Sequence, residues 1–190
     1  MLDISLEIKL SSRRCEEIKR IIVKMFVMYG ISCVPISGFE IAQKMGIKVI
    51  SYSAYPLEKR KLLLKKSVDG FSVEKVNRQW YIFYDDDRDK DYGRINNTIM
   101  HEVGHIVLDH SEDSELAEKE VKFFAKYALV PPVLVHKFEI SDPHKIADIF
   151  GVSFEAACYA LSYYQKWLHY GDNKYTDYEL VLLEQFKNAI

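Results

Sequence analysis

The pentapeptide His101-Glu102-Val103-Gly104-His105 decides how this chain is interpreted, because it holds two histidines and a glutamate at helical spacing. Residues i and i+4 share one face of a helix, so His101 and His105 can bind one metal ion. Glu102 lies about 100° further around the helix, where its carboxylate can take a proton from a water on that metal. Two imidazoles, a third protein ligand and an open position are typical of catalytic Zn²⁺, which is the expected cofactor.

The alternative to a metal motif is a solvated helix that carries two histidines by coincidence. The composition predicts about 0.015 H-E-x-x-H matches by chance in a chain of this length. Apolar residues recur at helical spacing around the pentapeptide, and no proline interrupts residues 91–110. We therefore expect a metal-binding helix with His101 and His105 as ligands and Glu102 as the general base.

The third ligand is expected on the next helix, which residues 114–129 predict and Pro131-Pro132 ends. Glu120 falls within the apolar stripe of that helix, whereas Glu118 points about 160° away from Glu120. A charge on a core-facing stripe is costly unless it is paired or bound to a metal. Glu120 is therefore the expected ligand and Glu118 an expected surface residue. The alternative is that Glu120 is a partly buried glutamate paired with a lysine.

Residues near the pentapeptide leave the rest of the site open. A third histidine at the short spacing used by some zinc peptidases is absent, because Ser111 stands there. His110 is interpreted as a helix-end residue near the negative pole of the helix dipole. Asp109 is a weak candidate for orienting a histidine ligand, and Tyr92 and Tyr163 are guesses for the group that stabilises the oxyanion.

Composition bounds the class of protein. The 190 residues carry 48% apolar residues and a net charge of −2, which suits a globular chain with no general affinity for nucleic acid or anionic membrane. Apolar runs are too short for a membrane span, and the N-terminus lacks a signal-peptide pattern. The three cysteines are widely spaced and are interpreted as free thiols in a reducing compartment, so we expect a cytoplasmic protein.

The rest of the pattern predicts a small sheet and several helices. Strands are expected at 47–52, 70–76 and 79–84, and earlier helices at 13–29, 38–45 and 56–66. Strand 79–84 is aromatic-rich and leads toward the motif helix, so we expect it to be the sheet edge that faces the active-site cleft. The acidic segment 85–91 is interpreted as a solvated loop, with a calcium site as the alternative.

The chain beyond residue 131 is expected to be helical. Two helices around Gly151 resemble a helix-turn-helix pair. The second of them begins with Phe154 and has no basic residue before Lys166, although phosphate contacts need lysine or arginine. Direct DNA binding is therefore not expected, and the pair is interpreted as scaffold or as a protein-binding surface. We expect a metallopeptidase domain at residues 1–131 and a helical C-terminal region at 132–190 packed on it.

Three stretches together resemble the ImmA/IrrE family of zinc metallopeptidases. Residues 94–105 are similar to the family's R-x-x-x-T-x-x-H-E-x-G-H stretch, and residues 120–131 to its E-A-N-x-F-A and M-P stretch. Residues 146–153 resemble the I-A-x-x-F-x-V-S segment that follows. The chain departs from the pattern at Val121, Lys122 and Val130, none of which is an expected ligand.

The resemblance implies a fold and an activity. The fold is α+β, with a zincin-like core that has a small sheet of about three strands and the H-E-x-x-H helix. The implied activity is a limited endopeptidase cut in a helix-turn-helix transcriptional repressor, which relieves repression of a mobile element or a stress operon. The alternative is a non-proteolytic zinc-binding regulator that binds a repressor, and an intact Glu102 argues against it.

Overall fold

The structure is a computed structural model that describes residues 9–87, 89–112, 114–170 and 174–189. Its helices are α1 Ser12–Tyr29, α2 Gly38–Lys44, α3 Leu57–Lys66, α4 Tyr92–Val107, α5 Glu115–Leu129, α6 Pro132–Lys137, α7 Pro143–Phe150, α8 Phe154–Tyr170 and α9 Asp177–Gln185. The strands are β1 Lys48–Ser51, β2 Gly70–Glu74 and β3 Trp80–Tyr84, and a 3₁₀ turn, η1, spans Tyr52–Ala54. This α+β architecture, with helices following a three-stranded sheet, is the one predicted.

The sheet has the strand order β1-β3-β2, so β3 is its central strand. β1 pairs with β3 in parallel, with Val49 opposite Ile82, and β2 pairs with β3 antiparallel, with Ser72 opposite Ile82. The prediction that the strand at 79–84 is a free edge beside the cleft is therefore wrong. The hairpin was expected to pair β2 with one side of this strand. The other side is occupied by β1, which is connected to the hairpin by a crossover through α3. The edges belong to β1 and β2.

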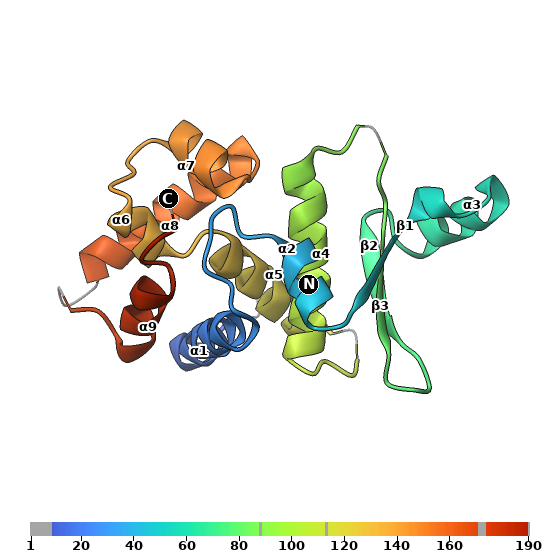
Figure 1. Ribbon diagram of the computed structural model, residues 1–190, viewed down its shortest axis with the longest axis horizontal. Coiled ribbons are helices and arrows are strands. Elements are labelled where there is room, and N and C mark those ends of the chain that lie inside the picture. The colour runs from blue at the N-terminus through green and yellow to red at the C-terminus, as the bar shows by residue number, and fades with distance from the viewer. Residues whose placement is uncertain (1–8, 88, 113, 171–173, 190) are drawn as a thin grey trace, which may run out of the picture.

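Helix α4 stands beside the sheet and packs against β2 and β3, while α5 runs back along α4 (Figure 1). Two glycines allow these close approaches. A Cβ on Gly70 would lie 2.7 Å from Thr98 Cγ2 and 2.8 Å from the Phe83 carbonyl oxygen, so β2 can meet α4 only without a side chain there. A Cβ on Gly104 would lie 3.0 Å from Phe124 Cδ1, which sets the spacing of α4 and α5.

Side-chain caps and one glycine mark the helix termini. Ser11 accepts a hydrogen bond from the Arg14 amide at the start of α1, and Gly30 ends the helix at φ 60°. Asp91 accepts from the Arg94 amide at 2.7 Å and so starts α4. Ser114 accepts from the Ala117 amide and starts α5. These local signals fix where the two helices of the candidate site begin.

The acidic segment after β3 is held by cations. Asp85 is 5% exposed and lies 3.2 Å from Lys90 Nζ and 3.5 Å from Arg60. Lys90 also contacts Asp69 at 2.9 Å. Burial alone would raise the pKa of Asp69, but hydrogen bonds from Lys90 and Arg94 bring it below its ordinary value. The segment is an ionic network that anchors the start of α4, which goes beyond the solvated loop that was predicted.

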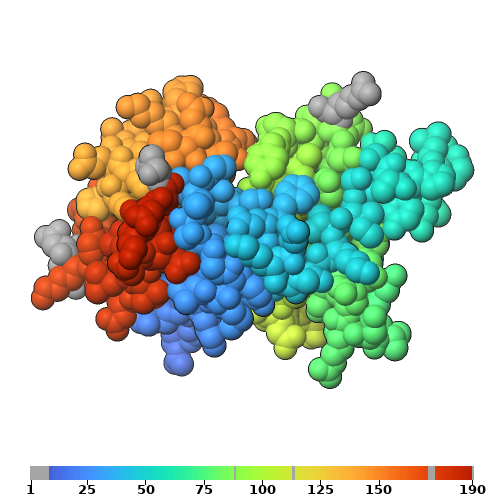
Figure 2. All heavy atoms as spheres, in the orientation of Figure 1, coloured from blue at the N-terminus to red at the C-terminus, as the bar shows by residue number. Residues whose placement is uncertain are grey.

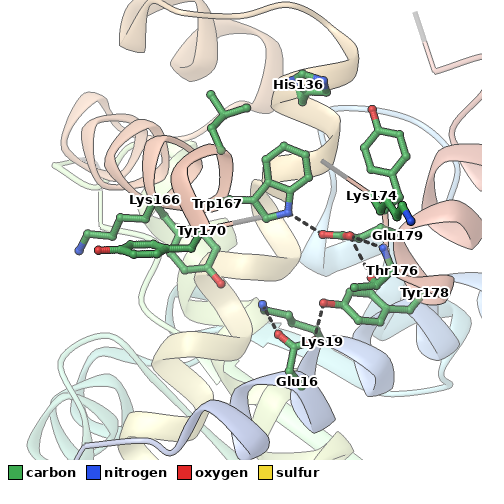
Figure 3. A pocket seen from close by; sticks show the side chains of 13 residues that line it. Glu16, Lys19, His136, Lys166, Trp167, Tyr170, Lys174, Thr176, Tyr178 and Glu179 are labelled. Carbon is green, nitrogen blue, oxygen red and sulfur yellow. Dashed lines mark hydrogen bonds and ion pairs between the residues drawn. The ribbon is translucent and has the colours of Figure 1, made fainter. Parts of the chain in front are cut away.

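Of the C-terminal helices, α9 packs on α1, while α8 packs on α6 and α7. None of the described helices has the length and apolarity to cross a bilayer. Between α1, α8 and α9 lies a cavity of about 610 Å³ (Figure 3). Glu16 accepts hydrogen bonds from Lys19 at 2.6 Å and from the Tyr178 hydroxyl at 2.7 Å. The division of the chain at residue 131 stays a prediction.

The opposite end of the molecule is formed by α3, none of whose residues is buried. Figures 1 and 2 show this helix standing out beyond the sheet. The predicted amphipathic helix at 56–66 is thus present, but it covers no core.

The three cysteines, Cys15, Cys33 and Cys158, are free thiols, as expected.

Candidate metal centre

Helices α4 and α5 bring three potential ligands together. His101 Nε2 and His105 Nε2 lie 3.3 Å apart on α4. Glu118, on α5, places Oε1 3.4 Å from His105 Nε2 and Oε2 3.7 Å from His101 Nε2. Two imidazoles and a carboxylate thus converge on one point, which is the donor set of many metallopeptidase sites.

The spacing of these donors tests whether a metal ion fits. Ligand atoms about 2.0–2.1 Å from a tetrahedral ion are roughly 3.3–3.4 Å from one another. The two histidine nitrogens are 3.3 Å apart, and the two Glu118 oxygens lie 3.4 Å from His105 Nε2 and 3.7 Å from His101 Nε2, so the three side chains are close to the spacing that one small cation requires. Burial lowers the pKa of His101, which favours the neutral imidazole that a cation requires. The residues present fit a divalent metal.

Glu120 is not brought to the two histidines. Its carboxylate is 6% exposed and accepts two hydrogen bonds from Arg14, from Nε at 2.8 Å and from Nη2 at 2.6 Å. These hydrogen bonds hold the pKa of Glu120 below its ordinary value. The expected set of His101, His105 and Glu120 therefore differs from the set that lies together, in which Glu118 takes the place of Glu120.

Glu120 is buried and its charge is paired, but the partner is an arginine and not a metal ion. Glu120 does lie on the buried stripe of α5, as predicted. Arg14 stands 106 positions earlier in the chain, on α1, and no sequence spacing reveals that contact. Glu118, expected at the surface, has a side chain that is 41% exposed, so it reaches the histidines from the solvent side of α5.

His110 links Glu120 to the ligand cluster. Its Nε2 lies 3.1 Å from Glu120 Oε2, and its Nδ1 lies 3.3 Å from His105 Nδ1. A carboxylate can only accept, so His110 Nε2 donates to Glu120. When His105 Nδ1 donates to His110 Nδ1, the lone pair of His105 Nε2 is directed at the cluster. Arg14, Glu120 and His110 thus form a chain of contacts that positions one metal ligand.

The sequence suggested Asp109 as the residue that orients a histidine ligand, whereas His110 makes that contact in the structure. Asp109, the weak candidate, is an exposed residue with φ 55°, and its left-handed backbone turns the chain so that His110 folds back toward His105. The signal was the histidine itself, five positions after His105 and just past the helix end. The helix-dipole interpretation of His110 explained its position without its side-chain contacts.

The other candidate residues are also located. Glu102 is 7% exposed and follows His101 on the buried side of α4. The Tyr92 hydroxyl donates to Ser37 Oγ at 3.4 Å, and the Tyr163 ring packs edge-on against Phe123. Burial raises the pKa of Tyr163. Neither contact assigns a tyrosine to oxyanion stabilisation.

Comparison with known families adds an independent finding. The sequence profile of the IrrE N-terminal-like domain, a peptidase family, matches residues 42–162. The matched segment contains the sheet, α4, α5 and most of α8. No protein of curated function matches the sequence. The match covers more than half of the chain and includes the ligand cluster, which supports a metallopeptidase function, and the chain therefore belongs to the IrrE N-terminal-like peptidase family.

Proposed function

We propose that this chain is a zinc-dependent endopeptidase that makes a limited cut in a helix-turn-helix transcriptional repressor and so relieves repression of a mobile element or a stress operon. The convergence of His101, His105 and Glu118 is the observation that carries the peptidase part. The repressor as substrate follows from the family resemblance, and it implies that the protein acts in the cytoplasm.

In this proposal Glu118 is the third zinc ligand, and Glu120 is a positioning residue. Glu118 places its carboxylate oxygens 3.7 Å from His101 Nε2 and 3.4 Å from His105 Nε2, whereas both oxygens of Glu120 are already engaged by Arg14 and His110. Moving Glu120 to the metal would break a two-point ion pair and leave the Arg14 guanidinium without its buried partner.

The remaining chemistry is assigned to Glu102. A bound zinc ion would supply Lewis acidity to a water and to the peptide carbonyl. Glu102, next to His101 and 7% exposed, sits where surrounding protein excludes most water. Its carboxylate accepts the proton of the attacking water and passes that proton to the leaving amine. His110 keeps the His105 ring from turning while this happens.

The test is coexpression with a helix-turn-helix protein encoded beside this chain, followed by detection of the cut fragment. Glu102→Gln preserves size and should keep the metal, but cleavage should fall by about 10²–10⁴-fold because the base is lost. Glu112→Gln, an exposed carboxylate outside the cluster, is the matched control and should cleave normally. Wild-type cleavage by Glu102→Gln would contradict the mechanism. Tight binding without any cut by the native protein would favour the non-proteolytic regulator.

A further inference from the structure

A second cavity lies next to the metal centre, between α4, α5 and α8. Its volume is about 210 Å³. The walls are mostly apolar and aromatic, and its principal contributors are Phe123 and Val130 from the α5 side and Ala156, Tyr159, Ala160 and Tyr163 from α8. Sites for drug-sized molecules are larger, at roughly 300–1,000 Å³. A cavity of this size suits one large side chain.

The lining of this cavity approaches the candidate site along both helices. Asn97 lines it, and Asn97 lies four residues before His101 on the same face of α4. Four residues of helix rise about 6 Å, which an extended peptide covers in about two residues. On α5, Phe123 in the cavity wall adjoins Lys122, whose Nζ lies 3.7 Å from Glu118 Oε2. A peptide bound at the metal therefore passes the mouth of the cavity.

The charge around the mouth is positive. Lys126 and Lys166 are exposed and line the cavity, and the exposed Lys122 stands between it and the ligand cluster. Lys126 Nζ lies 4.4 Å from the centre of the Tyr159 ring, which holds the ammonium group at the rim. Among the residues that the structure describes, those that line the cavity include no carboxylate. A neighbouring acidic residue on the bound peptide would be attracted there.

Helix α8 closes the outer wall, although it belongs to the region after residue 131. The turn before α8 touches the start of α4, since a Cβ on Gly93 would lie 3.0 Å from the Ser153 amide nitrogen. This contact fixes the helix-turn-helix-like pair against the catalytic helix (Figure 1). The pair thus has a structural position from which it can select a peptide.

We infer that this cavity is a specificity pocket for a large apolar side chain, aromatic or leucine-like, that lies within about two residues of the cleaved bond and has an acidic neighbour. The inference rests on the proposed peptidase function. Filling the pocket removes apolar area from water, whereas a methyl group in the same place leaves most of the walls exposed. Lys126 and Lys166 at the mouth add the preference for a carboxylate.

The test measures binding of short peptide hydroxamates to the zinc-loaded protein by calorimetry. The hydroxamate group binds the metal, and the adjacent side chain is Phe, Leu or Ala, each with an Asp or a Lys beside it. Phe and Leu should bind at least about tenfold tighter than Ala. Ala160→Phe fills the cavity from α8 and should abolish that preference. Gln165→Phe adds the same ring on the opposite, exposed face of α8 and should leave the preference unchanged.

A second variant keeps the test valid if Ala160→Phe fails to fold. Lys126→Glu changes an exposed residue at the rim, and it should weaken or reverse the preference for the Asp-containing ligands. Equal binding of Phe, Leu and Ala hydroxamates, or a preference that survives Ala160→Phe, overturns the pocket and leaves the metal centre intact. If no hydroxamate binds the metal-loaded protein, the peptidase site itself is wrong, and the pocket assignment falls with it.

Discussion

Replacing Glu118 and Glu120 by glutamine, one at a time, separates the metal ligand from the residue that orients the site. Glu120 accepts three hydrogen bonds, two from Arg14 and one from His110. A glutamine amide has one acceptor oxygen, so in either orientation its NH₂ group faces at least one of those donors. Glu120→Gln therefore leaves at least one charge-assisted hydrogen bond unmade.

The expected loss can be sized from this geometry. One hydrogen bond to a charged group contributes about 1.5–3 kcal/mol. The Arg14 side chain is 31% exposed, so water replaces part of what it loses. Glu120→Gln should lower the free energy of unfolding of the metal-free protein by about 2 kcal/mol. Because His110 then faces a neutral amide in place of a carboxylate, it is held less firmly against His105, and metal affinity should also fall by roughly 10- to 100-fold.

Glu118→Gln should change the stability little and the metal affinity strongly. The Glu118 side chain is 41% exposed, and that of its cationic partner Lys122 is 64% exposed. The free energy of unfolding of the metal-free protein should therefore change by less than about 0.5 kcal/mol. Metal affinity should fall by more than in Glu120→Gln, because a ligand is removed. Urea unfolding in the presence of a chelator gives the first quantity, and competition with a chromophoric chelator for Zn²⁺ gives the second. If Glu120→Gln loses more metal affinity than Glu118→Gln at unchanged stability, Glu120 is the ligand and the assignment here is wrong.

Three further changes test other parts of the structure. His110→Phe should lower metal affinity by roughly 10- to 100-fold with an unchanged circular dichroism spectrum, and wild-type affinity would remove His110 from the site. Gly70→Ala should lower the free energy of unfolding by about 1–3 kcal/mol, since the new Cβ meets the Phe83 carbonyl at 2.8 Å, and an unchanged urea midpoint would contradict that contact. The pKa of Asp69 is lowered in the folded state, so its contribution to stability is present above about pH 4 and is lost as the pH falls through the folded value. The stability difference between wild type and Asp69→Asn should accordingly shrink on acidification, and a difference that stays constant from about pH 6 to pH 3 would refute the linkage.

Local sequence determined the helices and most of their limits. The H-E-x-x-H spacing, the apolar periodicity and the caps act within one or two turns, where side chains contact their own backbone. The predicted motif helix, the next helix and the turn at Gly151 are therefore all present. The family could be named from the same stretches, and the sequence-profile match at residues 42–162 confirmed it.

Tertiary structure decided the contacts between residues that are far apart in the chain. β1 could pair with either edge of the hairpin, and its parallel pairing with β3 depends on a crossover that strand propensity does not encode. Glu118 and Glu120 lie two positions apart on one helix. Periodicity placed Glu120 on the buried face, as observed, whereas Glu118, expected at the surface, is half-buried and faces the histidines. The buried carboxylate of Glu120 pairs with Arg14 on α1. Helix α4 packs so that the side of α5 that carries Glu118 faces the two histidines. A burial cost predicts that a charged group needs a partner, but only the packing of three helices determines which partner it meets.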